Sequence, residues 1–187
     1  MKKRIIAIIL CCLMGLTLVA CVSSSKEKSK EKSTETHKVK TSKTNTKKFK
    51  PYFKNNVAEN ADIKIEITSV RVLGPGEEGN EYDDTPSIAF WYTATNKSDK
   101  EYTANFAWSY TFYATQDNDP NRVNELNESF CPDESLSEIE YDIIKKGGSV
   151  QGACAYPLDD STTPVTLIAK LSWEKREIGR INYSITG

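Results

Sequence analysis

A single histidine, His37, is present in the chain, in a segment dominated by lysine, serine and threonine. Serine and cysteine hydrolases need an imidazole beside the nucleophile, and histidine-based zinc sites need two or three imidazoles. No glycine-rich phosphate loop leads from a strand pattern into a helix pattern. The sequence therefore lacks the residues for these three kinds of chemistry, and it favours a protein that is not an enzyme.

Carboxylates are the remaining candidates for catalysis, because a pair of acids can hydrolyse a glycosidic bond without histidine. The acids gather in two segments that are rich in turn residues, where they are also expected simply for solvation and turn formation. A carboxylate-based hydrolase acting on wall glycans is therefore the third alternative for function. The acids in question are Glu77, Glu78, Glu81, Asp83, Asp84, Asp159 and Asp160.

The segment DNDPNRVNELNE has oxygen-bearing side chains at positions 1, 3, 5, 9 and 12, the ligand positions of an EF-hand calcium loop. Two features speak against that loop, since Arg122 stands where it needs glycine and Pro120 stiffens it. The alternative is an acidic hairpin loop. The candidate ligands are Asp117, Asp119, Asn121, Glu125 and Glu128.

Two aromatic residues, Trp91 and Tyr113, have the parity opposite to the main apolar residues of their segments, 87–96 and 106–116. In a sandwich of two sheets this parity faces solvent, and exposed tryptophan and tyrosine are common anchors of binding surfaces. The alternative is that a long connection, such as residues 117–135, covers this face of a central strand.

Residues 1–20 have the form of a lipoprotein signal peptide, with a basic cap followed by about 15 apolar residues. The tetrapeptide Leu-Val-Ala-Cys, which ends at Cys21, resembles the lipobox of bacterial lipoproteins. This resemblance implies cleavage before Cys21 and a diacylglyceryl group on its thiol, hence a membrane anchor that faces the extracellular side. The alternative is a chance cysteine after an ordinary cleavage site. No other cofactor is expected.

Residues 21–54, which begin with the lipidated cysteine, are expected to form a disordered basic tether. Residues 22–50 hold 10 lysines and 3 glutamates, a net charge of +7, whereas residues 51–187 carry a net charge of −11. This segment has few aliphatic residues, so it cannot bury enough apolar surface to offset the entropy that is lost when a chain becomes ordered. The lysines either attract anionic lipids or wall polymers, or the segment is a plain spacer. No nucleic-acid partner is expected, because no aromatic residues interleave with the lysines.

Residues 55–187 show the alternation of apolar and polar residues that is typical of β-strands. The phase of the alternation changes at Thr68-Ser69, which predicts a β-bulge. Residues 120–130 are compatible with a helical turn or two. Cys131 and Cys154 either form a disulfide, which an extracellular location permits, or remain free thiols. Seven strands are predicted, over residues 63–72, 87–96, 106–116, 137–144, 149–158, 164–173 and 179–185.

Many short strands joined by turns predict an all-β fold, an antiparallel β-sandwich in one domain. The segments VAENADIKIEITSVRVL, AFWYTATNKSDK and KKGGSVQGACAYPLDDSTTPVTL resemble a family of Gram-positive surface lipoproteins with one uncharacterised domain. The pattern is similar to the immunoglobulin-like sandwich of a mycobacterial secreted antigen. The resemblance covers most of residues 55–173. It implies an immunoglobulin-like fold and a lipid anchor, and it implies no activity.

The anchor sequence, the missing histidine constellation and the acidic sandwich predict a non-enzymatic surface lipoprotein. Its sandwich would bind a protein or a cell-wall polymer outside the membrane. The alternative is a lipoprotein that binds calcium or a small solute.

Overall fold

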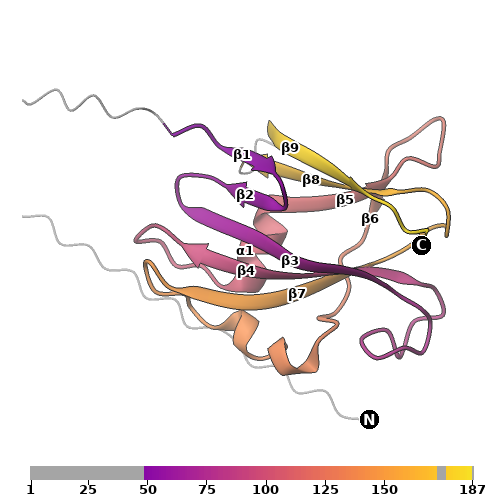
Figure 1. Ribbon diagram of the computed structural model, residues 1–187, viewed down its shortest axis with the longest axis horizontal. Helices are drawn as coiled ribbons and strands as arrows, with labels where there is room; N and C mark the ends of the chain where they lie inside the picture. Colours follow the sequence, from indigo (N-terminus) through magenta and orange to yellow (C-terminus); the bar gives the residue numbers. More distant parts are fainter. Residues whose placement is uncertain (1–48, 172–175, 187) are drawn as a thin grey trace, which may run out of the picture. The chain divides into compact units, whose positions relative to one another are not determined.

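The computed structural model describes residues 49–171 and 176–186 (Figure 1). The expected signal peptide, the lipidation site Cys21 and the tether up to residue 48 lie outside the described residues. Within the described part, no helix is long and apolar enough to cross a membrane.

Two antiparallel sheets pack face to face, as Figure 1 shows. This arrangement confirms the predicted all-β, immunoglobulin-like sandwich. Sheet A has the strand order β1-β2-β3-β4-β7, and sheet B has the order β6-β5-β8-β9. The strands of sheet A are β1 (Tyr52–Lys54), β2 (Val57–Glu59), β3 (Ile63–Leu73), β4 (Ser87–Asn96) and β7 (Ser149–Pro157). The strands of sheet B are β5 (Phe112–Gln116), β6 (Asn124–Leu126), β8 (Val165–Leu171) and β9 (Arg176–Tyr183).

The centre of sheet A follows the predicted alternation closely. Strands β3 and β4 pair over their full lengths, and the register shifts between Ile67 and Ser69, which confirms the predicted bulge. Beyond a bulge the side chains change faces. Leu73, at the far end of β3, therefore lies in a small cluster with Ala89 and Ala155 that is separate from the main core.

The main core lies between the sheets and is centred on Trp108, which is fully buried. Its ring stacks on Tyr92 with the centroids 4.5 Å apart and packs against Phe112 at 4.6 Å. Its Nε1 donates a hydrogen bond of 2.9 Å to the hydroxyl of Tyr156, which satisfies both buried polar groups. Tyr92 lies over Gly152, where a Cβ would approach its hydroxyl to 2.6 Å, so the core requires glycine there.

The predicted strand over residues 106–116 is wrong in its first half, where the chain forms the helix α1 (Ala104–Thr111). The buried residues of α1 are Ala104, Ala107, Trp108 and Thr111, which recur with the helical spacing of three and four. The Thr103 side chain accepts a hydrogen bond from the Phe106 amide and caps the helix. The capping residue and the two alanines fit the helix better than the alternating aromatics fit a strand.

The predicted strand over residues 137–144 is also wrong. The segment instead contains the short 3₁₀ helix η2 (Ile139–Tyr141), which follows a similar helix η1 (Glu134–Leu136), and Glu140 is buried. Glu140 accepts a hydrogen bond of 3.4 Å from the Ala153 amide, and the Ser129 amide donates to the Ala155 carbonyl oxygen at 2.8 Å. Residues 129–141 thus cover part of the side of β7 that faces away from β4. The three apolar residues that suggested a strand are exposed, namely Ile139, Tyr141 and Ile143.

Three short strands were not predicted. The predicted helical turn at residues 120–130 is wrong, because β6 pairs there with β5 and buries Asn124 and Leu126. Strands β1 and β2 form a hairpin whose first strand lies in residues expected to belong to the tether. The hairpin is held against β9, since the Tyr183 hydroxyl donates to Asn56 Oδ1 at 2.9 Å.

Candidate functional site

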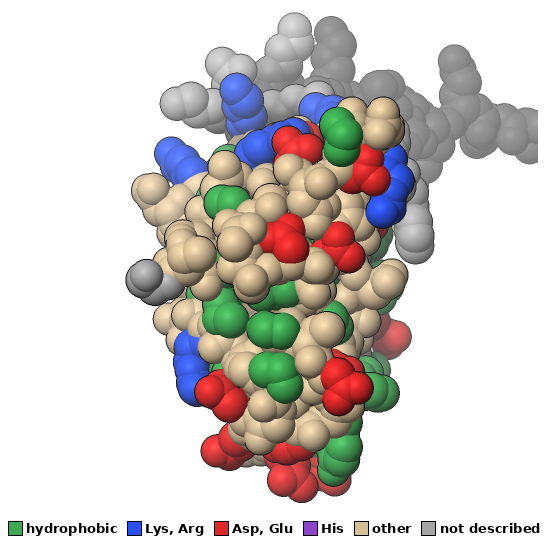
Figure 2. All heavy atoms as spheres, turned by 90° about the vertical axis from the view of Figure 1, so that its right-hand side faces the viewer, with side chains coloured by type: hydrophobic (Ala, Val, Ile, Leu, Met, Phe, Trp, Pro, Cys, Tyr) green, Lys and Arg blue, Asp and Glu red, His purple; other side chains and the backbone are tan. Residues whose placement is uncertain are grey.

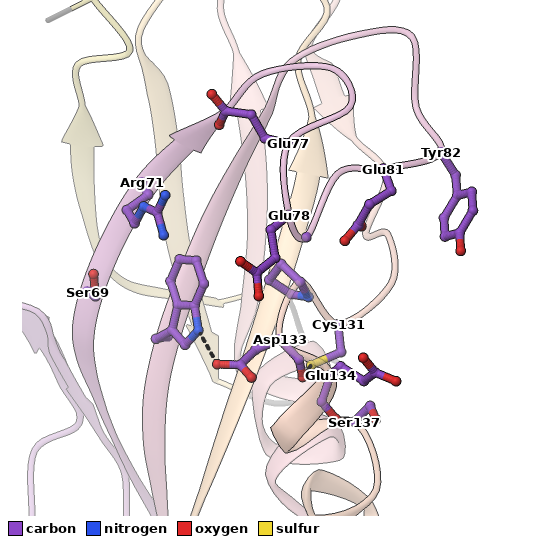
Figure 3. Close-up of a pocket in the computed structure, with 13 residues that line it drawn as sticks. Ser69, Arg71, Glu77, Glu78, Glu81, Tyr82, Cys131, Asp133, Glu134 and Ser137 are labelled. Atoms are coloured by element: carbon purple, nitrogen blue, oxygen red, sulfur yellow. Dashed lines mark hydrogen bonds between the residues drawn. The ribbon is translucent and has the colours of Figure 1, made fainter.

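A cleft of about 920 Å³ lies on the outer face of sheet A, over the bulged half of β3 and the start of β4 (Figure 3). We call it the Trp91 cleft, after the side chain at its floor. Its first wall is the β3–β4 connection, residues 74–86, and its second wall is the segment 131–137. The residues that line it are Ser69, Arg71, Glu77, Glu78, Gly79, Glu81, Tyr82, Trp91, Cys131, Pro132, Asp133, Glu134 and Ser137.

The floor is the indole of Trp91, which the opposite parity of this residue puts outside the main core. Ser69 and Arg71 lie beside it on β3, because the bulge turns their side chains to the same face. The Arg71 guanidinium lies over the indole, 5.8 Å from the ring centroid, within the range of a cation–π contact. Trp91 is half-buried, so part of this aromatic surface is accessible.

The first wall is held in place by one buried amide side chain. Asn80 Nδ2 donates to the carbonyl oxygens of Gly74 and Thr85, at 3.0 and 2.9 Å. The Glu77 carboxylate accepts a hydrogen bond of 2.9 Å from the Gly74 amide. These bonds satisfy the main chain of a long connection and give it a defined shape.

The second wall is attached to the floor through Asp133. Its carboxylate accepts hydrogen bonds from Trp91 Nε1 at 2.9 Å and from the Ser135 hydroxyl at 2.6 Å. These bonds stabilise the charged form, and the pKa of Asp133 lies below its usual value, mainly through Ser135. The two walls also touch each other, because a Cβ added to Gly79 would overlap the carbonyl oxygen of Pro132.

The cleft is strongly acidic, since one arginine stands against five carboxylates in its lining. Backbone hydrogen bonds, first that of Gly79, lower the pKa of Glu81. Within the part of the chain that is described, Glu78 and Glu134 have no hydrogen-bond or ion-pair partner for their side chains. In Figure 2 most basic side chains lie at the upper end of the face that is drawn, whereas acidic side chains occur at its lower end as well as in its middle and upper parts.

Both cysteines that the structure describes are free thiols, so it does not contain the disulfide considered above. Cys131 lies in the second wall, and its thiol donates to the Asp133 carbonyl oxygen at 3.3 Å. Burial raises the pKa of Cys131 to about 11, which keeps the thiol protonated and unreactive. Cys154 is buried in the main core, where burial raises the pKa of its thiol as well.

The five candidate calcium ligands do not converge, so this prediction is corrected. Among the described residues, no three His, Cys, Asp or Glu side chains form a group that could hold a metal ion. Asp119 is bound by Arg122 at 2.7 Å, and Glu125 extends from the short strand β6. The Glu128 carboxylate accepts a hydrogen bond from Ser109 of α1 at 2.9 Å. Pairing of β6 with β5 prevents the segment from winding into a loop around an ion. Asp117 and Asn121 are exposed.

The predicted acid clusters reach different places. Glu77, Glu78 and Glu81 line the cleft, whereas Asp159 and Asp160 are held by Asn118, whose amide donates to both at 2.8 Å. Asp83 and Asp84 are not among the residues of the lining.

The two predicted aromatic anchors, Trp91 and Tyr113, lie on different sheets. Tyr113 lies on the outer face of sheet B, away from the main core, and Lys170 Nζ is 5.3 Å from its ring centroid. Trp91 instead meets Asp133 of the 117–135 connection, as the alternative reading expected. The sequence reasoning missed that Asp133 and the β3–β4 connection build walls around it. The density of glycine and acids in GPGEEGN was the available signal.

Comparisons with known proteins identify relatives of the fold. A family described as "Domain of unknown function (DUF5067)" matches residues 22–170. A solved structure described as a "putative lipoprotein" from Staphylococcus aureus subsp. aureus NCTC 8325 is 19% identical, with a TM-score of 0.62. That match covers 73% of this chain and 92% of the other, and at this identity it shows the fold alone. No curated protein matches the chain. Neither match is to a mycobacterial antigen, so that part of the resemblance stays a prediction.

Proposed function

Since the chain belongs to the family described as Domain of unknown function (DUF5067), whose description assigns no activity, we propose a function from its anchor sequence and its cleft. The protein is a lipid-anchored, non-enzymatic surface lipoprotein. It uses the Trp91 cleft to bind a protein or a cell-wall polymer outside the membrane.

The anchor rests on the N-terminal sequence. The lipobox-like tetrapeptide ending at Cys21 follows a basic cap and an apolar run in the right order. A diacylglyceryl group carries two acyl chains, and two chains hold a protein at a membrane where one gives only marginal binding. The likeness in fold to a structure described as a lipoprotein supports the same proposal.

The cleft is the observation that carries the binding function. Its volume of about 920 Å³ falls within the range of about 300–1,000 Å³ that is typical of ligand pockets. Its floor is a half-buried tryptophan, a residue type enriched among the side chains that dominate binding energy. The charged side chains of the lining include no imidazole, and its single thiol is protonated, which supports binding over catalysis.

The test is crosslinking on intact cells, followed by capture of the protein and identification of whatever is joined to it. Wild type, Cys21→Ala, Trp91→Ala and the matched control Tyr113→Ala would be compared. We expect a defined partner with the wild type and with Tyr113→Ala, and its loss with Trp91→Ala. Cys21→Ala should move the protein from the membrane fraction into the medium. An unchanged partner with Trp91→Ala would overturn the role of the cleft.

A small solute is the second candidate occupant, because the cleft is also of the size that holds one. A thermal shift of the purified protein with low-molecular-weight extracts of the growth medium distinguishes the two. A ligand at 100 times its dissociation constant stabilises the fold by about 2.7 kcal/mol. A shift that disappears with Trp91→Ala, without any crosslinked macromolecule, would favour the solute.

A further inference from the structure

We propose that the Trp91 cleft selects a cationic peptide segment, with a lysine or arginine side chain held between its walls and against the indole. This inference rests on the proposed binding function and names the chemistry of the occupant. Three features of the cleft support it.

The first feature is the indole itself. The Arg71 guanidinium already lies 5.8 Å from the ring centroid, and Arg71 has no carboxylate partner within the described residues. A cation is attracted to the face of tryptophan more strongly than to that of any other aromatic side chain. A cation of the ligand would make the same kind of contact on the accessible part of the Trp91 ring as the Arg71 guanidinium makes.

The second feature is the set of carboxylates that remain available. Glu77 and Asp133 hold the walls together, through the Gly74 amide and through Trp91 Nε1. The side chains of Glu78 and Glu134 make no hydrogen bond or ion pair within the described chain, although they line opposite walls. Figure 3 shows the Glu78 side chain pointing from the first wall toward the indole and Asp133.

The third feature is the size and shape of the cleft. A volume of about 920 Å³ is much larger than one ammonium group requires, and hydroxyls of Ser69 and Ser137 line it besides the acids. Five carboxylates against one guanidinium concentrate cations there, and walls of low dielectric focus the field. A short basic segment fills this space and satisfies acids on both walls, whereas a free amine satisfies one.

The outer face of sheet B provides an internal comparison. Tyr113 there also has a cation over its ring, Lys170 at 5.3 Å, yet no residue of the cleft's lining comes from this face. Acidic side chains such as Glu125 and Asp117 are exposed in the β5–β6 hairpin. Replacing these two acids removes the same charge from the protein without touching the Trp91 cleft.

The test is calorimetric titration of the lipidated protein in detergent with capped tetralysine, tetraserine and tetraglutamate peptides and with spermidine. We expect tetralysine alone to bind with one site per protein. The double variant Glu78→Gln/Glu134→Gln should weaken it at least tenfold, and Asp117→Asn/Glu125→Gln less than twofold. Raising the salt from about 0.05 to about 0.5 M should weaken it further, because exposed charges are screened.

Each other outcome overturns the inference in a recognisable way. Equal losses with the two double variants would mean attraction to the net charge alone. If spermidine bound as tightly as tetralysine, the cleft would recognise ammonium groups and not a peptide. If Trp91→Ala abolishes the crosslinked partner on cells while Glu78→Gln/Glu134→Gln does not, the proposed function stands and the cationic occupant is wrong. If neither change affects the partner, the cleft is not the site.

Discussion

Trp91 on sheet A and Tyr113 on sheet B begin from the same sequence feature and reach different surroundings. Each has the parity that points away from the main core, each is half-buried, and each has a cation over its ring. Around Trp91 the β3–β4 connection and the segment 131–137 rise as two walls. Tyr113 pairs across the sheet with Ile168 and has Lys170 over its ring, and no residue of the cleft's lining lies on this face. Parity alone therefore selects an exposed aromatic residue, and the connections decide whether it becomes part of a cleft.

The largest effect that sharpens this comparison is expected from Gly79→Ala. Gly79 has φ +88, and a Cβ would overlap the Pro132 carbonyl oxygen of the opposite wall. Backbone strain and overpacking each cost about 1–3 kcal/mol, so urea denaturation should show a loss of about 2–6 kcal/mol. Gly76→Ala is the control, since Gly76 has φ +75 with no atom within 4 Å of the added Cβ. Similar losses in the two variants would mean that the walls do not depend on their contact.

The next effect concerns binding. Trp91→Ala should lower the affinity for the partner or for the tetralysine peptide at least tenfold, about 1.4 kcal/mol. The substitution removes the floor of the cleft and the hydrogen bond to Asp133. Trp91→Phe keeps a ring and should retain part of the affinity. Tyr113→Ala should change the affinity less than twofold in the same titration. Equal effects of Trp91→Ala and Tyr113→Ala would break the comparison.

A smaller effect is expected from Glu140, which follows the segment that builds the second wall. Burial raises the pKa of Glu140 above its usual value of 4.5, and the charge of Glu128 adds to this. The folded protein thus binds this proton more tightly than the unfolded chain does. The stability that Glu140 contributes is complete below pH 4.5 and is lost as the pH rises through the raised pKa.

Denaturation by urea between pH 4.5 and 8 checks this sign. Glu140→Gln should remove part of the decline in stability with rising pH and gain relative to wild type toward pH 8. The nearby exposed acid Glu138, changed to Gln, should leave the decline as it is. A steeper decline in Glu140→Gln would contradict the assignment.

The smallest effect is expected on the open face of sheet B. Lys170→Ala removes the cation above Tyr113, an exposed contact worth about 0.5–1 kcal/mol at most. Thermal unfolding should therefore shift by a few degrees or less, with the affinity of the cleft unchanged. A larger loss of binding with Lys170→Ala would show that this face takes part in recognition.

The sequence predicted correctly those strands in which apolar and polar residues alternate regularly. The alternation in 87–96 and 149–158, and the phase change at Thr68-Ser69, gave β4, β7 and the bulge. These strands have one face in the core, so the two-residue period is preserved. The tryptophan at the floor of the cleft followed from the same period.

The errors occurred where side chains from distant segments decide the local structure. The aromatics of 106–111 alternate like a strand, but the core takes Trp108 with two alanines on a helical face. Residues 137–144 alternate as well, but Glu140 and the edge of β7 form a contact that no local pattern contains. The second wall of the cleft depends on the hydrogen bond between Asp133 and Trp91 in the same way. Contacts over such sequence distances cannot be read from periodicity.

The contacts of Ser129 and Glu140 along β7 have a consequence for the lipid-anchored form that we propose. Anchored molecules share a thin layer, where their local concentration is high and they meet in similar orientations. An edge strand with free amide and carbonyl groups recruits strands from other molecules and starts polymerisation. The covering segment pairs with one amide and one carbonyl group of β7, those of Ala153 and Ala155, and it buries the carboxylate of Glu140. In the proposed anchored form, this segment leaves fewer groups of β7 free to pair with strands of neighbouring copies.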